Sequence, residues 1–96
     1  MNGTDIIITA VEGGINYWAA IIEYENGPGK GKVTLEDMYE GGTYTVTAGQ
    51  ATAAAQEVMR LYPKTRGAGY IKADDIDGEA ADMIVQVACF GQIVYG

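Results

Sequence analysis

The stretch KVTLEDMYEGGTYTVT, residues 32–47, decides the fold of this chain. Apolar and polar side chains alternate through residues 32–39 and again through residues 43–47, and a period of two is typical of β-strands with one buried face. Gly41 and Gly42, which separate the two runs, favour a tight turn. We therefore predict a β-hairpin in which the three threonines of the second strand share one face.

A third strand is predicted over residues 15–25, INYWAAIIEYE, because they are rich in aromatic and β-branched side chains. It ends at residues 26–31, NGPGKG, a composition typical of a turn or loop. Residues 5–12 also contain a β-branched run that suits a strand. However, Thr4 is a plausible helix N-cap and Gly13 a plausible helix stop, so we predict a short helix there.

Two helices are expected after the sheet. Thr47 would cap a helix through residues 51–62, and the glycine-containing residues 64–69 would form a loop. The last helix would end at Gly91, and its first turns would hold acidic residues, which the helix dipole favours there: Asp74, Asp75, Asp77, Glu79 and Asp82. The prediction is an α+β fold with a short N-terminal helix, a three-stranded antiparallel sheet and two C-terminal helices packed on it.

The composition limits the partners. Ninety-six residues are enough for one hydrophobic core, so residues 1–96 are expected to form a single domain. The formal net charge of −7 argues against binding to DNA, RNA or anionic membranes, because those polyanions select basic surfaces. We find no signal peptide and no apolar run long enough to span a bilayer. The single cysteine, Cys89, is expected to be a small buried hydrophobe, which suits a reducing cytoplasm.

Residues needed for common catalytic mechanisms are missing. The chain contains no histidine and no serine, which excludes a serine triad and a cysteine–histidine pair, and one cysteine supplies no zinc site. Helix capping explains the acids of residues 74–79 better than a calcium loop does. Glu36, Asp37 and Glu40 are expected to form a solvated edge. We expect no catalysis, no cofactor and no metal, although a hydrolase with a metal on paired carboxylates stays open.

One group of candidate ligand-binding residues is basic. Arg60, Lys64 and Arg66 fall in one stretch with Tyr70, next to glycines whose backbone amides can bind a small anion such as a phosphate. The alternative is ordinary surface charge near a helix C-terminus, where cations are favoured.

The second candidate group is Gly13, Gly14, Asn16, Tyr17 and Trp18. Two glycines let the backbone approach a ligand or turn sharply, and the aromatic rings offer flat faces that can stack on a base. Neighbouring residues of a strand point to opposite faces, so Tyr17 and Trp18 line one pocket only if the strand is irregular there. A core position for Trp18 is an equally good interpretation.

Residues 9–19, TAVEGGINYWA, and residues 82–96, DMIVQVACFGQIVYG, are the most distinctive stretches. Both resemble a family of small bacteriophage and prophage proteins that share a T-A-x-E-G-G-I-x-Y-W signature and are mostly unassigned in function. The resemblance implies a small accessory phage protein in the cytoplasm of the infected bacterial host. Such proteins, when they lack catalytic residues, are often counter-defence factors.

Two counter-defence mechanisms follow from this context. Our first hypothesis is a homo-oligomer that sequesters a small nucleotide-derived immune signal, with basic residues on the phosphate and aromatic residues on the base. The alternative is an acidic inhibitor of the DNA-mimic type that binds a bacterial defence protein. An unassigned structural or accessory phage role is a third possibility.

Overall fold

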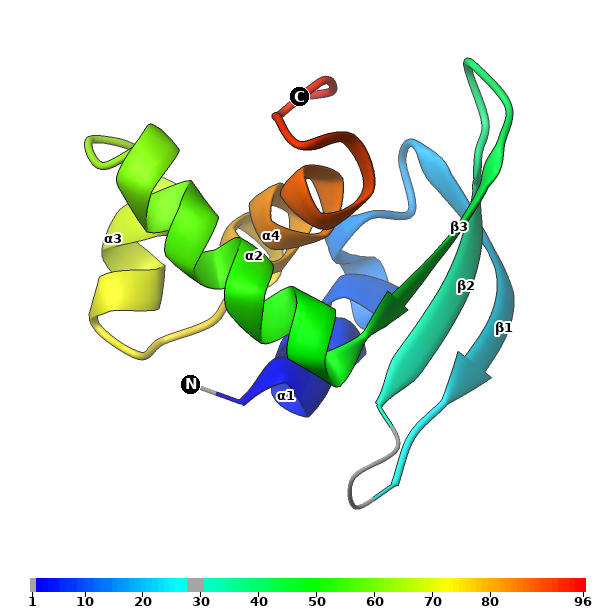
Figure 1. The fold of residues 1–96 in the computed structure, drawn as a ribbon, viewed down its shortest axis with the longest axis horizontal. Coiled ribbons are helices and arrows are strands. Elements are labelled where there is room, and N and C mark those ends of the chain that lie inside the picture. The colour runs from blue at the N-terminus through cyan, green and yellow to red at the C-terminus, as the bar shows by residue number, and fades with distance from the viewer. Residues whose placement is uncertain (1, 28–30) are drawn as a thin grey trace.

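The computed structural model describes residues 2–27 and 31–96, and it confirms the predicted α+β fold (Figure 1). Among these residues, one helix with a π-helical extension precedes a three-stranded sheet, and three helices follow it. The elements in chain order are α1 (Gly3–Thr9), the π-helical turn η1 (Ala10–Gly14), β1 (Ala19–Glu25), β2 (Lys32–Asp37), β3 (Thr43–Thr47), α2 (Ala48–Leu61), α3 (Arg66–Lys72) and α4 (Gly78–Phe90). Within the described part of the chain, no helix is long and apolar enough to cross a membrane.

The three strands form one antiparallel sheet in the order β1-β2-β3. Leu35 is buried at its centre, paired with Ile21 on one side and Tyr44 on the other. Thr34 and Thr45 are paired on the outer face, where their hydroxyl oxygens lie 3.1 Å apart. The hairpin and the face that its threonines share are therefore as predicted, although β2 ends at Asp37, two residues before the predicted end of the alternation.

The first strand is shorter than the predicted residues 15–25. It begins at Ala19, because the chain turns at Ile15, whose carbonyl accepts hydrogen bonds from the Trp18 amide at 3.1 Å and the Ala19 amide at 2.9 Å. At the other end of the strand, the predicted loop over residues 26–31 includes residues 28–30, which lie outside the described residues.

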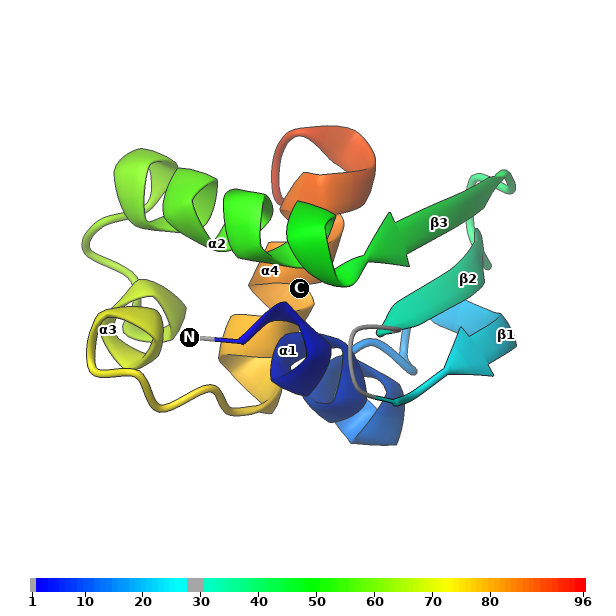
Figure 2. The same ribbon diagram turned by 60° about the horizontal axis from the view of Figure 1, so that its bottom comes forward.

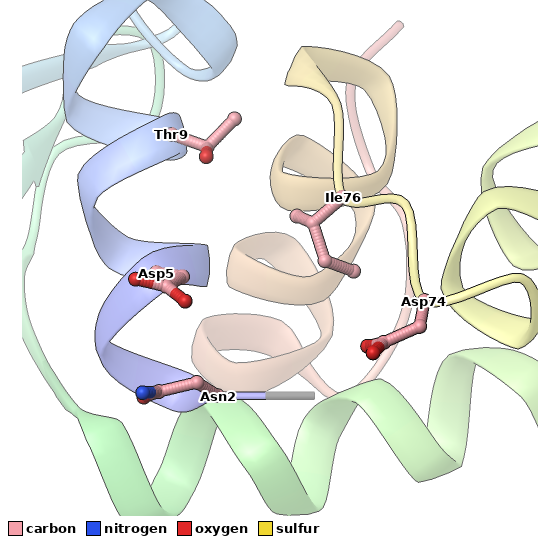
Figure 3. A pocket seen from close by; sticks show the side chains of 5 residues that line it. All are labelled: Asn2, Asp5, Thr9, Asp74 and Ile76. Atoms are coloured by element: carbon pink, nitrogen blue, oxygen red, sulfur yellow. The ribbon is translucent and has the colours of Figure 1, made fainter.

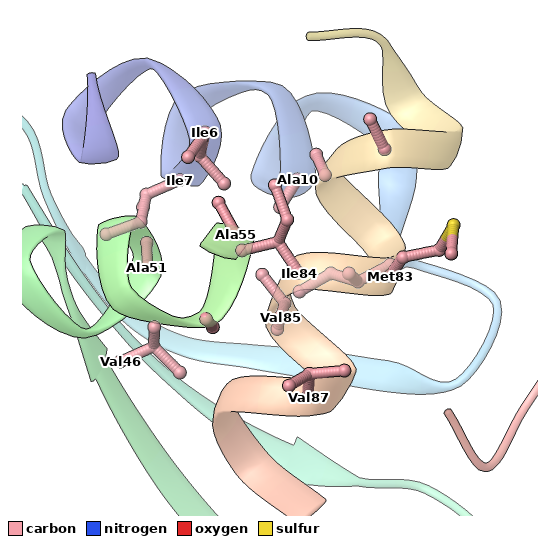
Figure 4. Close-up of a cluster of buried hydrophobic side chains, with 14 of the residues drawn as sticks. Ile6, Ile7, Ala10, Val46, Ala51, Ala55, Met83, Ile84, Val85 and Val87 are labelled. Carbon is pink, nitrogen blue, oxygen red and sulfur yellow. The ribbon is translucent and has the colours of Figure 1, made fainter. Parts of the chain in front are cut away.

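The helices pack on one face of the sheet, and α4 lies in the middle of the molecule (Figures 1 and 2). Side chains from α1, α2, β3 and α4 meet in the core, as Figure 4 shows for Ile6, Ile7, Ala51, Val46 and Ile84, all of them buried. Complete burial of an isoleucine stabilises a fold by about 1.5–3 kcal/mol. The small alanine side chain on α2 lets the neighbouring helices approach closely.

The N-terminal helix is confirmed, but its start differs from the prediction. The N-cap is Asn2, whose side-chain oxygen accepts a hydrogen bond from the Thr4 amide at 2.9 Å, so Thr4 lies inside the helix. Gly3 then lies against the backbone carbonyl of Ala48 at the start of α2, where a β-carbon would have no room. The contact between α1 and α2 therefore requires a glycine at this position.

Thr47 caps α2 as predicted. Its hydroxyl accepts a hydrogen bond from the Gln50 amide at 3.2 Å, and the Gln50 side chain accepts one from the Thr47 amide at 2.9 Å, which completes a capping box. The helix starts directly after Thr47, at Ala48, whereas the predicted helix was residues 51–62.

The loop predicted over residues 64–69 is wrong, because α3 begins within it. Thr65 is the N-cap of α3, and its hydroxyl accepts a hydrogen bond from the Ala68 amide at 3.2 Å. Ile71 and Ala68 are buried. Tertiary packing therefore outweighs the low helix propensity of the two glycines in this segment, and three helices rather than two follow the sheet.

The positions of the acidic residues around the start of α4 also differ from the predicted positions. The helix begins at Gly78, and Asp77 is its N-cap, accepting a hydrogen bond from the Ala80 amide at 2.9 Å. Asp74 and Asp75 thus precede the helix instead of occupying its first turn. The predicted end is confirmed, since Gly91 has the left-handed backbone conformation that stops α4.

Candidate functional site

The side chains of Tyr17 and Trp18 converge on one carboxylate of α4. The Tyr17 hydroxyl donates to Asp82 Oδ2 at 2.6 Å, and Trp18 Nε1 donates to Asp82 Oδ1 at 2.8 Å. This convergence is possible because both residues lie in the turn before β1, where the strand alternation does not apply. Burial and the hydrogen bond to Asp82 raise the pKa of Tyr17, so its hydroxyl stays protonated and donating.

Gln86, one turn further along α4, joins this carboxylate to the end of the chain. Its Nε2 donates to Asp82 Oδ1 at 2.9 Å and to the Tyr95 carbonyl at 3.0 Å. Its Oε1 accepts from the amides of Val94 at 2.8 Å and Tyr95 at 2.7 Å. Gln86 is fully buried, so it holds residues 92–96, which we call the C-terminal segment, against α4.

Gln86 binds the backbone of Tyr95, and a second carboxylate, that of Asp37 at the end of β2, binds its side-chain hydroxyl. The Tyr95 hydroxyl lies 2.8 and 2.7 Å from the two carboxylate oxygens, and the amides of Tyr39 and Glu40 donate to Oδ1 at 2.9 and 3.2 Å. Burial alone would raise the pKa of Asp37, but these hydrogen bonds outweigh it and lower the pKa below its usual value.

The sequence interpretation of Glu36, Asp37 and Glu40 as a solvated edge is therefore wrong for Asp37. Only 2% of its surface is exposed, whereas Glu36 and Glu40 are exposed as expected. The strand alternation places Asp37 on the inner face together with Leu35, and the donors of the following turn and of Tyr95 satisfy its charge.

Aromatic rings fill the space between the two carboxylates. Tyr95 lies between Trp18 and Tyr39, with ring centroids 5.5 and 5.3 Å away, and Phe90 contacts Trp18 at 5.4 Å. Trp18 has no exposed surface, so it belongs to the core. Partial burial and the adjacent Asp37 raise the pKa of Tyr95 to about 12.

Three large side chains above this network remain exposed. Tyr39 is 68% exposed, Val94 48% and Tyr17 46%. They are linked to one another, because the Tyr39 hydroxyl donates to the Tyr17 carbonyl at 3.3 Å and Gln86 binds both the Val94 amide and the Tyr17 hydroxyl. We call these three residues the tyrosine surface.

The predicted group of basic ligand-binding residues lies on and between α2 and α3, away from the tyrosine surface. The Arg60 guanidinium forms an ion pair with Glu57 at 2.7 Å. Arg66 Nε donates to the Tyr70 hydroxyl at 2.9 Å, the guanidinium lies 5.6 Å from the centre of that ring, and Lys64 is exposed. Figures 1 and 2 place α3 and the turn before β1 on opposite sides of α4. A single chain therefore does not bring the two predicted groups of ligand-binding residues together.

The glycines of the second predicted group have different surroundings. A β-carbon on Gly14 would lie 2.9 Å from the carbonyl oxygen of Gly78, so Gly14 lets η1 approach the start of α4. The sequence correctly indicated a close backbone approach here, but the group approached is this protein's own backbone. Gly13 and Asn16 are exposed.

A cavity of about 290 Å³ lies between α1 and the segment before α4 (Figure 3). Ile76 and four polar side chains line it: Asn2, Asp5, Thr9 and Asp74. Asn2, Asp5 and Asp74 are exposed to solvent, so the cavity lacks the desolvated polar groups that give a binding site its selectivity. The described residues contain no group of three or more acidic, cysteine or histidine side chains that could hold a metal ion.

Comparisons of the chain with protein-family models, with curated proteins and with solved structures give no match. The functional argument therefore rests on the geometry of the molecule. Residues 9–19 and 82–96, the two most distinctive stretches of the sequence, are in direct contact in space through Tyr17, Trp18 and Asp82. Sequence reasoning identified Tyr17 and Trp18 but missed Asp37, Asp82, Gln86 and Tyr95, because only their long-range partners distinguish them.

Proposed function

We propose that this chain is a non-catalytic binding protein that contacts a protein partner through its tyrosine surface. The observation that carries the proposal is the exposure of Tyr39 and Tyr17 above a hydrogen-bonded network of buried groups. Tyrosine is enriched in protein interfaces because a large ring with few rotatable bonds loses little entropy when a partner covers it. Scattered exposed apolar residues need no explanation, whereas exposed residues linked to one another do.

Rigidity supports the proposal. Gln86 fixes the C-terminal segment next to Tyr17, and Asp37 fixes the turn that carries Tyr39. A surface that already has its bound conformation loses less free energy to ordering when the partner binds. The network would therefore increase the affinity of the surface without touching the partner.

The geometry favours the acidic inhibitor over the nucleotide-sequestering protein. Trp18 has no exposed face on which a base could stack, and the Arg60 guanidinium is occupied by Glu57. If the resemblance to phage proteins is correct, the partner is a bacterial defence protein and the site of action is the cytoplasm of the infected host. Nucleotide sequestration would need a second protomer to bring α3 next to Tyr17.

The test uses the purified chain as bait for bacterial lysate, followed by purification of the captured protein and measurement of its affinity. Tyr39→Ala should reduce that affinity at least tenfold, because an aromatic anchor in an interface contributes about 2 kcal/mol or more. Leu61→Ala is the matched control, since Leu61 is 41% exposed on α2, and it should bind like the unchanged chain.

Two results would contradict the proposal. One is a captured protein that binds the Tyr39→Ala and Tyr17→Ala variants as tightly as the unchanged chain. The other is a native mass spectrum in which the chain, purified from bacteria with nucleotide-signalling defences, carries a small nucleotide, which would restore sequestration as the better hypothesis. The same spectrum reports whether the chain is a homo-oligomer.

A further inference from the structure

We infer that the tyrosine surface recognises a cationic side chain of its partner, an arginine or a lysine, which lies on the rings of Tyr39 and Tyr17. This inference rests on the proposed function and names the chemistry of the partner. Four features of the described residues support it: uncompensated negative charge below the surface, polarised rings, the distance of the basic residues, and the poor fit of anionic ligands.

No ion pair among the described residues compensates the negative charge below the tyrosine surface. Asp37 is buried and Asp82 is half-buried, and their hydrogen-bond donors are neutral amides, phenols, an indole and a carboxamide. Within the described part of the chain, neither forms an ion pair. A charge at low dielectric acts over a longer distance than a solvated one, so both carboxylates attract a cation placed above the rings. Glu40, exposed next to them, adds to this attraction.

The rings themselves are suited to a cation. The face of a tyrosine ring carries the negative part of its quadrupole, and cations bind within about 6 Å of the ring centre. The Tyr17 hydroxyl donates to Asp82 at 2.6 Å and the Tyr95 hydroxyl to Asp37 at 2.7 Å. Hydrogen bonding to a carboxylate moves electron density into the phenol, which strengthens the attraction of a ring for a cation. Tyr39 lies against Tyr95 and leaves most of its own surface exposed.

Three basic side chains among the described residues have partners elsewhere and do not compete for this surface. Lys32 forms an ion pair with Glu25 at 3.9 Å, and Arg60 forms one with Glu57. Arg66 donates a hydrogen bond to the Tyr70 hydroxyl within α3. Figure 1 places α3 on the far side of α4 from the turn before β1. Arg66 also has the acids Glu79 and Asp77 near it, away from the tyrosine surface.

Anionic ligands fit the tyrosine surface poorly. The surroundings of Tyr39 are acidic, so Asp37, Asp82 and Glu40 would repel the negatively charged phosphate of a nucleotide stacked on its ring. A neutral apolar partner would use the rings but not the charge. An arginine uses both, because its planar guanidinium stacks on aromatic faces and always carries a positive charge.

The experiment compares the peptide amides triarginine and tricitrulline, since citrulline has the shape of arginine but no charge. Binding to the ¹⁵N-labelled full chain is followed by amide chemical shifts. We expect triarginine to shift the amides of Tyr17, Tyr39 and Glu40 and to bind more tightly than tricitrulline. Replacing the ring by Tyr39→Leu should weaken triarginine binding about two- to fivefold, while Tyr39→Phe should leave it unchanged.

The Tyr39 pair of variants separates ring recognition from the general attraction of an acidic protein for a basic peptide, because neither substitution changes the net charge. Tyr39→Leu is expected to fold, since the side chain is mostly exposed. Equal triarginine affinity for Tyr39→Leu and Tyr39→Phe, or shifts confined to residues 74–79, would overturn the inference. If the captured protein still requires Tyr39 but triarginine does not, the proposed function stands and only the cationic anchor fails.

Discussion

Replacing Gln86 by methionine should detach the C-terminal segment from α4. Methionine fills a similar volume, but it can neither donate to Asp82 and the Tyr95 carbonyl nor accept from the Val94 and Tyr95 amides. Because Gln86 is fully buried, water cannot replace these hydrogen bonds while the segment stays in place.

The expected loss of stability is about 2–4 kcal/mol. A buried polar group that loses its partner costs about 1–3 kcal/mol, and three groups of the C-terminal segment would lose theirs. The segment can instead leave α4 and become hydrated, which limits the loss to the packing of Tyr95 and the bonds to Gln86. For a chain of 96 residues, with a free energy of unfolding of about 5–15 kcal/mol, this is a large fraction of the total.

Urea denaturation measures this loss directly, because Trp18 is the single tryptophan, is buried, and stacks on Tyr95. Hydrogen exchange at the Val94 and Tyr95 amides should accelerate in the same variant. Gln56→Met, at an exposed position of α2, is the matched control and should change the free energy of unfolding by less than about 0.5 kcal/mol. A loss below about 1 kcal/mol with unchanged exchange at Tyr95 would refute the argument that Gln86 holds the C-terminal segment.

Three further predictions concern single residues. The pKa of Asp37 is lowered in the folded chain, so its contribution to stability is present above the ordinary pKa of 3.8 and is lost as the pH falls from there through the folded-state pKa. Urea midpoints should therefore drop as the pH falls below about 3.8, and less so for Asp37→Asn. Cys89 is only partly buried, not fully as the sequence suggested, yet desolvation raises its pKa from 9.0 to about 12. Its reaction with iodoacetamide near neutral pH should therefore be about a thousandfold slower in the folded chain than in urea, and equal rates would contradict this partial burial. Gly3→Ala should lower the urea midpoint because its β-carbon meets the Ala48 carbonyl, whereas Gly69→Ala, with open space on α3, should raise it; equal midpoints would disprove the close contact of α1 and α2.

Local sequence signals were sufficient for much of the fold. The alternation in residues 32–47 identifies the hairpin because one face of each strand is buried, and the side chain of Thr47 caps α2 through contacts within one turn. Even at Asn2, where the predicted cap was two residues too late, the correct cap is of the expected chemical type. These features depend on neighbours in sequence, so the sequence determines them directly.

Long-range packing determined the features that the sequence did not predict. The helix α3 contains two glycines, and its stability comes from burial of residues such as Ala68 and Ile71. Asp37 and Asp82 resemble other acids of an acidic chain until their partners 58 and 65 residues away are known. The candidate site consists almost entirely of such long-range pairs, which is why its predicted residues included Tyr17 and Trp18 but no carboxylate.

The carboxylates of Asp37 and Asp82 raise the question of why this site contains ionised groups and not neutral amides. An asparagine in place of Asp37 would still accept hydrogen bonds from the amides of Tyr39 and Glu40, and the Tyr95 hydroxyl could turn to accept from it. Stability alone therefore gives a weak reason for an ionised group, whose burial costs several kcal/mol before hydrogen bonds offset it. A partner cation supplies a stronger one, since it would compensate the charge only in the complex. The prediction that separates these explanations is that Asp37→Asn folds with a modest loss of stability yet weakens the binding of triarginine more than Glu23→Gln does, a variant that removes one exposed charge of β1. A purely structural carboxylate at position 37 would weaken that binding no more than this control.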